Sequence, residues 1–169
     1  VVGFDKGKAQ VTVQPGVAIN RKGHALSLAQ AVSLRLERGT ASGTDASTVL
    51  VQGLSKANFH DGCRVRFGPD GKLWVTTGDG GVGTHPQNLD SVNGKVLRIN
   101  SDGTAPGDNP FVGQGGDDRL YTYGHRNPQG IAFRPSDNRP FTAENGPWHS
   151  DEVTALVNGG NAGWDPRPN

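Results

Sequence analysis

The 169-residue sequence contains no methionine, one cysteine and no apolar run near the ~20 residues of a membrane-spanning helix. The single cysteine, Cys63, excludes a disulfide framework, and we expect it to be a small buried residue rather than a redox-active thiol. Without an initiator methionine or a signal peptide, a mature or trimmed chain is expected. The net charge is +1 and both signs are scattered, which argues against a nucleic-acid partner.

Turn-forming residues, in contrast, are abundant. The chain has 26 glycines and 11 prolines, and the glycine share is about twice the average usage of ~7%. Frequent tight turns in a short chain favour short strands over helices. The composition therefore predicts an all-β fold.

The segment after residue 60 shows alternating strands and turns. Arg64–Phe67 alternates polar and apolar residues, Gly68–Gly71 carries proline and glycine for a tight turn, and Leu73–Thr77 is rich in β-forming residues. Later strands are predicted at Lys95–Asn100, Leu120–Gly124, Ile131–Arg134, Phe141–Glu144 and Glu152–Val157.

The first fifty residues are less informative. Val32–Leu36 alternates like a strand, and Thr48–Val51 resembles its hairpin partner. Leu26–Leu36 is also compatible with a short amphipathic helix, and Val1–Arg21 yields no motif.

An ungapped repeat becomes visible when the chain is shifted against itself by 66 residues. The shift aligns Phe67 with Phe133, Pro69 with Pro135, Thr76 with Thr142, Gly80 with Gly146, and Val65 with Ile131. For units of four short strands, such a period predicts propeller blades; the alternative is two unrelated hairpins with similar turns.

The same shift aligns four polar residues. His60 falls on Arg126, and Asp79 falls on Asn145. Equivalent positions of successive blades lie side by side around a propeller's central channel. We therefore expect these four side chains to converge on one channel mouth, where a ligand could bind.

Three segments resemble a known family: Phe59–Gly71, Tyr123–Gly130, and Glu144–Pro147 with Asp151 and Glu152. Between them lie Thr77–Asp79, Asn93–Arg98 and Asp108–Phe111. In this order they resemble the glucose/sorbosone dehydrogenases, soluble aldose dehydrogenases that use pyrroloquinoline quinone (PQQ). The resemblance covers roughly residues 30–166.

The resemblance implies a six-bladed β-propeller with PQQ and Ca²⁺ at the channel mouth. This chain would cover roughly two to three four-stranded blades, with an unclear segment at 1–30 and a partial propeller at 31–169. A closed ring would then need further blades from missing sequence, or a second chain as in a dimer.

The resemblance also assigns roles to the four polar residues and to Asn127. His60 matches the general base that takes the proton from the anomeric hydroxyl of an aldose, and Arg126 matches the arginine at the quinone oxygens. Asn127 matches a cofactor contact, Asp79 a polar residue at the mouth or a turn cap, and Asn145 replaces a more usual glutamine.

Two pairs of residues are implied as calcium ligands. Gly146 and Pro147 match main-chain carbonyls that hold the calcium of the cofactor, while Asp151 and Glu152 match carboxylates of a nearby structural calcium site. Ala162 stands where the family has tyrosine and Cys63 where glycine is common. The cations that bind the PQQ carboxylates belong mostly to later blades.

The expected function is therefore oxidation of an aldose to its lactone, with an external electron acceptor, in the periplasm or outside the cell. Two alternatives stay open at this stage. One is a non-catalytic propeller that binds a protein or glycan, and the other is a calcium-dependent propeller hydrolase.

Overall fold

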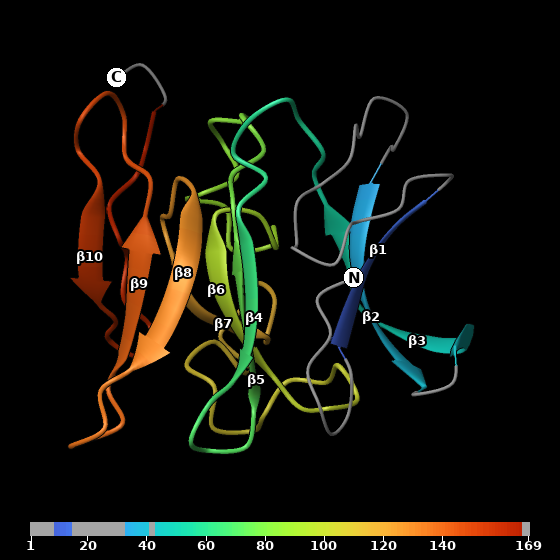
Figure 1. Cartoon of the computed structure of the whole chain (residues 1–169). Helices are drawn as coiled ribbons and strands as arrows, with labels where there is room; N and C mark the ends of the chain where they lie inside the picture. Colours follow the sequence, from blue (N-terminus) through green and yellow to red (C-terminus); the bar gives the residue numbers. More distant parts are fainter. Residues whose placement is uncertain (1–8, 15–32, 41–42, 167–169) are drawn as a thin grey trace.

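The computed structural model describes residues 9–14, 33–40 and 43–166. These residues form ten strands in three antiparallel sheets and contain no α-helix (Figure 1). The described part accordingly has no helix that could cross a membrane. The prediction of an all-β fold is confirmed.

The chain builds the three sheets one after another. The first sheet has the order β1-β2-β3 and consists of β1 (Ala9–Gln14), β2 (Ser33–Thr40) and β3 (Gly43–Leu54). The middle sheet has the order β4-β5-β6-β7 and consists of β4 (Cys63–Phe67), β5 (Leu73–Thr77), β6 (Lys95–Ile99) and β7 (Leu120–Tyr123). The third sheet has the order β10-β9-β8 and consists of β8 (Pro128–Phe133), β9 (Pro140–Glu144) and β10 (Glu152–Ala155).

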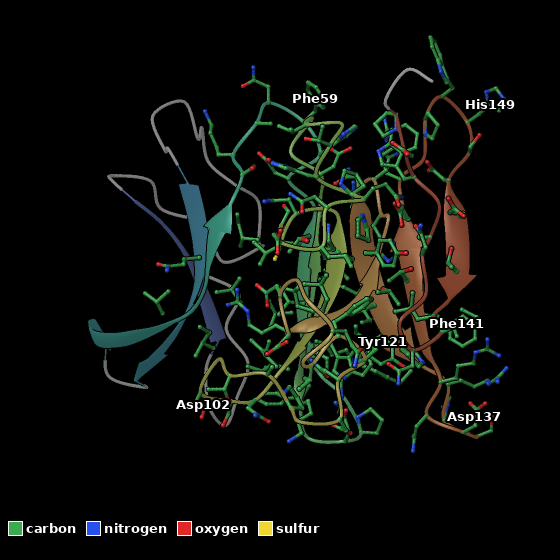
Figure 2. All side chains as sticks on the ribbon, turned by 180° about the vertical axis from the view of Figure 1, so that it is seen from behind. Phe59, Asp102, Tyr121, Asp137, Phe141 and His149 are labelled. Carbon is green, nitrogen blue, oxygen red and sulfur yellow. The ribbon has the colours of Figure 1, made fainter. Side chains whose placement is uncertain are left out.

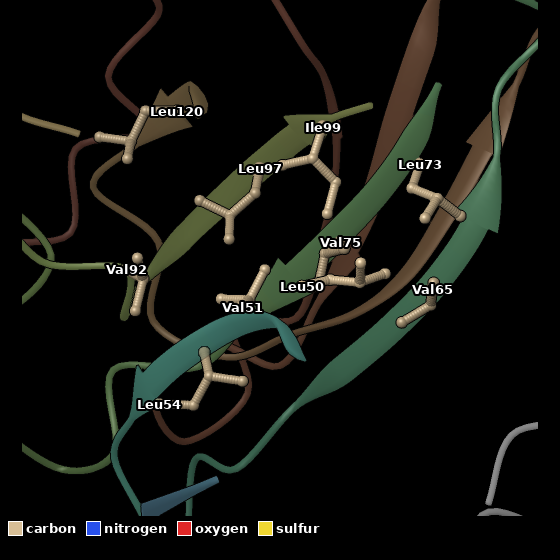
Figure 3. Packing of buried hydrophobic residues seen from close by; sticks show 10 residues of the cluster. All are labelled: Leu50, Val51, Leu54, Val65, Leu73, Val75, Val92, Leu97, Ile99 and Leu120. Carbon is tan, nitrogen blue, oxygen red and sulfur yellow. The ribbon is translucent and has the colours of Figure 1, made fainter. Parts of the chain in front are cut away.

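The middle sheet is buried on both faces. Every residue of β5 and of β6 is buried, although both strands alternate in side-chain direction. One face, with Val75 and Leu97, packs on Leu50, Val51 and Leu54 of β3 in a cluster that Figure 3 shows. Burial of such apolar area, at ~25 cal/mol per Å², is the main stabilising term of the fold.

The opposite face of the middle sheet packs on the third sheet. Trp74 and Val96 meet Ile131 and Leu156 there. The Trp74 ring also contacts Phe133 edge-on at 5.3 Å between ring centroids. Two apolar clusters thus hold the three successive sheets together.

Both halves of the sequence repeat form antiparallel hairpins in the structure, and their registers differ. Strands β4 and β5 correspond to β8 and β9, but Phe67 pairs with Leu73 whereas Phe133 pairs with Pro140. The second turn is therefore one residue longer, and an irregularity between Pro128 and Gly130 follows in β8. An ungapped comparison of sequences could not show this difference.

Three expectations about other segments need correction or completion. Residues 33–36 belong to β2, so a helix over Leu26–Leu36 is wrong for this part; residues 26–32 lie outside the described ones. Strand β1 had no recognised motif, yet it pairs with β2. Cys63 is exposed rather than buried, because it lies at the start of β4, where Val65 is the only buried residue of the strand.

A close backbone contact follows β5. A Cβ atom on Gly78 would lie 1.8 Å from the His60 carbonyl oxygen, so only glycine fits between these two segments. His60 itself has φ 60°, a left-handed conformation that non-glycine residues rarely adopt. The end of β5 therefore fixes the backbone that carries His60.

Replacing Gly78 by alanine should test this contact. We expect Gly78→Ala to lower the free energy of unfolding by about 1–3 kcal/mol, because the added methyl group forces the two backbones apart. Gly107→Ala is the matched control, since a Cβ there meets nothing within 4 Å. Urea unfolding of both variants measures the difference, and equal stabilities would contradict the proposed backbone constraint.

Candidate functional site

Loops at one end of the sheets bring the predicted polar residues together. Figure 2 labels Phe59 and His149 at this end, and Asp137 and Tyr121 toward the other. Main-chain hydrogen bonds tie the loops to one another, for example from Asp79 N to Arg126 O at 2.8 Å and from Asn145 N to Asn127 O at 3.1 Å. The convergence expected from the repeat is thus present in the structure.

His60 and Asp79 form a close pair. The distance from His60 Nδ1 to Asp79 Oδ1 is 2.7 Å, and the two side chains are 13% and 3% exposed. An ionised carboxylate only accepts hydrogen bonds, so this contact requires a proton on Nδ1. In the neutral ring, Nε2 then keeps its lone pair and can act as a base.

The Asp79 carboxylate accepts two further hydrogen bonds. Gly81 N donates to Oδ1 at 2.7 Å, and the indole Nε1 of Trp164 donates to Oδ2 at 2.9 Å. Asp79 therefore caps its own turn, as one reading of the sequence expected, and also holds His60. It joins three segments of the chain at one buried carboxylate.

Arg126 also contacts Trp164. Its Cζ atom is 5.5 Å from the centroid of the Trp164 ring, within the range of cation–π attraction. Its Nη1 atom donates to the carbonyls of Asn145 and Gly146 at 2.8 and 2.9 Å and to Asn145 Oδ1 at 3.1 Å. Its Nε atom is buried and has no partner among the described residues.

A buried acid supports the turn that carries Arg126 and Asn127. Glu144 accepts hydrogen bonds from the backbone N–H groups of both residues, and its other oxygen is 2.7 Å from His125 Nδ1. His125 is fully buried, and its Nε2 atom is 2.8 Å from the Thr122 hydroxyl. Asn127 is buried, and its side-chain oxygen accepts a hydrogen bond from Gly62 N. The side chain thereby joins the turn after β7 to the segment that carries His60.

The expected calcium ligands lie in the loop between β9 and β10. Gly146 and Pro147 line a cavity of about 160 Å³ together with Glu152, Arg126 and Trp164. Their carbonyls already accept one hydrogen bond each, from Arg126 and from Ser150 N, and each retains a second lone pair.

Asp151, expected with Glu152 at the structural calcium site, makes hydrogen bonds within the same loop. Asp151 accepts hydrogen bonds from Asn145 Nδ2 and Gly146 N at 2.9 and 3.1 Å. Asp151 therefore shapes the loop, and it also lines a neighbouring cavity together with Glu152. In the described part, no three His, Cys, Asp or Glu side chains gather as a metal site. Main-chain oxygens would have to supply most ligands.

Two ionisable groups beside the site are shifted by burial. Partial burial raises the pKa of the Asp61 carboxyl above its ordinary range, although the Ala57 N–H and Lys56 oppose the shift. Burial lowers the pKa of Lys95 to about 7. The Lys95 ammonium donates to three main-chain carbonyls, two of them at 2.7 Å, and so holds the loop that precedes β6.

The sequence reasoning missed the supporting residues of the site. Glu144 and His125 are polar residues inside the protein, with only 6% and 0% of their surface exposed. Trp164 contacts Asp79 although 85 positions separate them in the sequence. An acid at the end of the apolar strand β9 was a usable signal for Glu144. Nothing local in the sequence indicates the contact of Trp164.

Comparisons with known proteins place the chain in one family. Residues 17–168 match the profile described as Glucose / Sorbosone dehydrogenase. The chain is 38% identical over 134 residues to quinoprotein glucose dehydrogenase B of Acinetobacter calcoaceticus, covering 68% of this chain and 28% of that protein. It is 37% identical over 133 residues to the aldose sugar dehydrogenase YliI of Escherichia coli strain K12, covering 77% and 36%.

Solved structures give the same result. The PQQ-bound aldose sugar dehydrogenase of Streptomyces coelicolor has a TM-score of 0.71 and 34% identity, over 82% of this chain and 42% of that chain. A putative glucose dehydrogenase of Thermus thermophilus has a TM-score of 0.73 and 29% identity, over 97% and 54%. The chain thus spans only about a third of the two curated relatives. It belongs to the glucose/sorbosone dehydrogenase family.

Proposed function

We propose that this chain carries the catalytic residues of a PQQ- and calcium-dependent aldose dehydrogenase with a six-bladed propeller fold. The observation that supports this most is the His60–Asp79 pair at 2.7 Å, which leaves Nε2 of His60 available as a base. Arg126 provides a cation beside the Trp164 ring, which also contacts Asp79. Oxidation of an alcohol carbon needs a base and a nearby positive charge of this kind.

The protein groups would act as follows. His60 Nε2 accepts the proton of the anomeric hydroxyl, while Asp79 holds the ring and stabilises the imidazolium that forms. Bound PQQ would supply the electrophilic carbonyl that accepts the hydride from the anomeric carbon, and the sugar would become the lactone. Arg126 stabilises negative charge that develops on an oxygen of the acceptor.

The residues present fit part of the cofactor. Arg126 is a single cation with an unpartnered buried Nε atom, and the Asn145 side chain beside it is exposed. This set suits the quinone oxygens. It does not suit three carboxylates, for which we expect cations outside this chain.

The loop at Gly146 fits a hard cation. Gly146, Pro147 and Glu152 line one cavity, and the main-chain carbonyls of the first two each keep a free lone pair. Calcium binds carbonyl and carboxylate oxygens readily. When bound there, the ion would act as a Lewis acid on the quinone. Asp151 and Glu152, which line a neighbouring cavity together, stay the proposed carboxylates of a nearby structural calcium site, and Asp151 also positions the loop through its hydrogen bonds to Asn145 and Gly146.

The backbone conformation of His60 and its contact with Asp79 favour an enzyme over a non-catalytic binding propeller. A binding module has no need for a histidine in a left-handed conformation that is oriented by a buried carboxylate, because such strain is costly and is typical of catalytic sites. Because the cations for the PQQ carboxylates are expected outside this chain, the direct test uses the complete propeller that contains it: reduction of a dye after PQQ and Ca²⁺ are added, with aldoses as donors. No reduction with any aldose would remove the dehydrogenase proposal.

The role of His60 can be separated from cofactor binding. His60→Ala should lower turnover by ~10²–10⁴-fold, since general-base catalysis typically contributes that much. PQQ affinity should stay nearly unchanged, because the imidazole is not a proposed cofactor contact. Steady-state kinetics at saturating PQQ and calcium measure the effect, with the exposed His149→Ala as control. Near-normal turnover of His60→Ala would refute the assignment.

The metal loop gives a further prediction. In Gly146→Ala the new Cβ would lie 1.8 Å from the Ser150 carbonyl oxygen, so the loop must shift. We expect calcium affinity to fall at least about tenfold, because a loss of ~1.4 kcal/mol suffices. Pro147→Ala keeps its carbonyl and should retain calcium within a few-fold. Calorimetric titration compares the two, and equal affinities would contradict ligation by the main chain.

A further inference from the structure

The side chain of Trp164 touches both charged centres of the site from one segment. Its Nε1 atom donates to Asp79 Oδ2 at 2.9 Å, and its ring lies 5.5 Å from the Arg126 guanidinium carbon. We propose that Trp164 is a positioning residue. Its N–H fixes the rotation of the Asp79 carboxylate, and its ring holds the Arg126 guanidinium in place by cation–π attraction. The base and the cation are thereby held in one fixed arrangement.

The hydrogen bonds of Asp79 explain why the indole N–H matters. Oδ1 accepts from both His60 and Gly81, whereas Oδ2 has Trp164 as its partner in the described part of the chain. The terminal torsion of an aspartate side chain is broad, so the carboxylate rotates unless both oxygens are held. Rotation would weaken the contact that keeps the proton of His60 on Nδ1.

Trp164 is itself firmly anchored. Its backbone N donates to Gly124 O at 2.8 Å, and its carbonyl accepts from Gln87 Nε2 at 2.8 Å. The Gln87 amide also exchanges two hydrogen bonds with the Asn161 amide, at 2.9 and 3.1 Å. The segment around Trp164 is therefore bound to the loop between β5 and β6, and the indole has a defined place.

Several ionisable groups lie around the His60–Asp79 pair, so the effect of Trp164 must be separated from theirs. Asp61 follows His60 in the chain, His85 Nδ1 lies 3.0 Å from the Asp79 carbonyl, and the Arg126 guanidinium lies over the Trp164 ring. Replacing Trp164 by phenylalanine changes none of these charges. It removes the N–H and keeps an aromatic ring beneath Arg126.

The first experiment needs neither PQQ nor sugar. Ring-¹⁵N spectra at pH ~8.5, where an ordinary histidine is neutral, report which nitrogen of His60 carries the proton. We expect Nδ1 to be protonated in the parent protein, and a mixture of tautomers in Trp164→Phe. Unchanged spectra in the variant would overturn the proposal, as would an Nε2-protonated ring in the parent.

A matched control is available at the far end of the middle sheet. Trp74 Nε1 donates to Asp70 Oδ1 at 3.2 Å, so Trp74→Phe removes the same kind of hydrogen bond away from the site. It should leave the tautomer of His60 unchanged. An equal change in both variants would mean a general loss of structure and would refute a specific role for Trp164.

A double-mutant cycle tests whether Trp164 acts through Asp79. In an Asp79→Asn background, Trp164→Phe should cause no further change in the His60 spectrum, because residues of one network are not additive. Additive changes would contradict the proposed path.

The kinetic test rests on the proposed function. Trp164→Phe should lower kcat about tenfold, as the loss of one hydrogen bond to a charged group implies, with KM for the sugar within about twofold. Trp164→Leu removes the ring as well and should weaken PQQ binding a further two- to fivefold, roughly. A normal kcat in Trp164→Phe would refute the role in catalysis. If the parent protein oxidises no aldose, the proposed function fails while the NMR experiments still decide the positioning role.

Discussion

The whole site depends on the buried carboxylate of Asp79, which accepts three N–H groups from three segments. Gly81 closes the local turn, His60 supplies the reactive ring, and Trp164 comes from the far end of the described chain. A carboxylate on a side chain that is only 3% exposed is costly unless each oxygen is paired, and here each is. One set of hydrogen bonds therefore fixes both the stability and the geometry of this end of the molecule.

The sheets supply the rigid base for this arrangement. The middle sheet has apolar partners on both faces, so its strands cannot slide without exposing one set of side chains. Strand β5 ends at Thr77, and the next residues, Gly78 and Asp79, reach His60 directly. The position of the histidine is thus a consequence of how β5 is packed.

Local patterns were sufficient to predict the strands from β4 onward. Alternation and turn residues in Arg64–Thr77 have a strong physical basis, and the repeat extended the result to β8 and β9. The site residues His60, Asp79, Arg126 and Asn145 were also found, because equivalent loops of successive sheets meet at one end. Their catalytic roles, the calcium ligands, the number of blades and the location of the protein stay predictions.

The missed features are those that depend on distant contacts. Strand β1 is held by pairing with β2, and no motif of its own marks it. Cys63 looked like a core residue by type, and it shares the face of the buried Val65 because side chains alternate along a strand, but it is exposed at the first position of β4. Glu144 and His125 form a buried pair between β9 and the turn after β7, which no short window of sequence contains.

The separation of 85 positions between Asp79 and Trp164 also affects the order of folding. Contacts between distant positions form late, because the entropy of closing a long loop must be overcome before the contact stabilises it. On the ribosome, the sheets β4–β7 and β8–β10 are synthesised before the indole that contacts Asp79 emerges. These two sheets can therefore pair their strands first, and the His60 ring gains its fixed orientation only after residue 164 has been added.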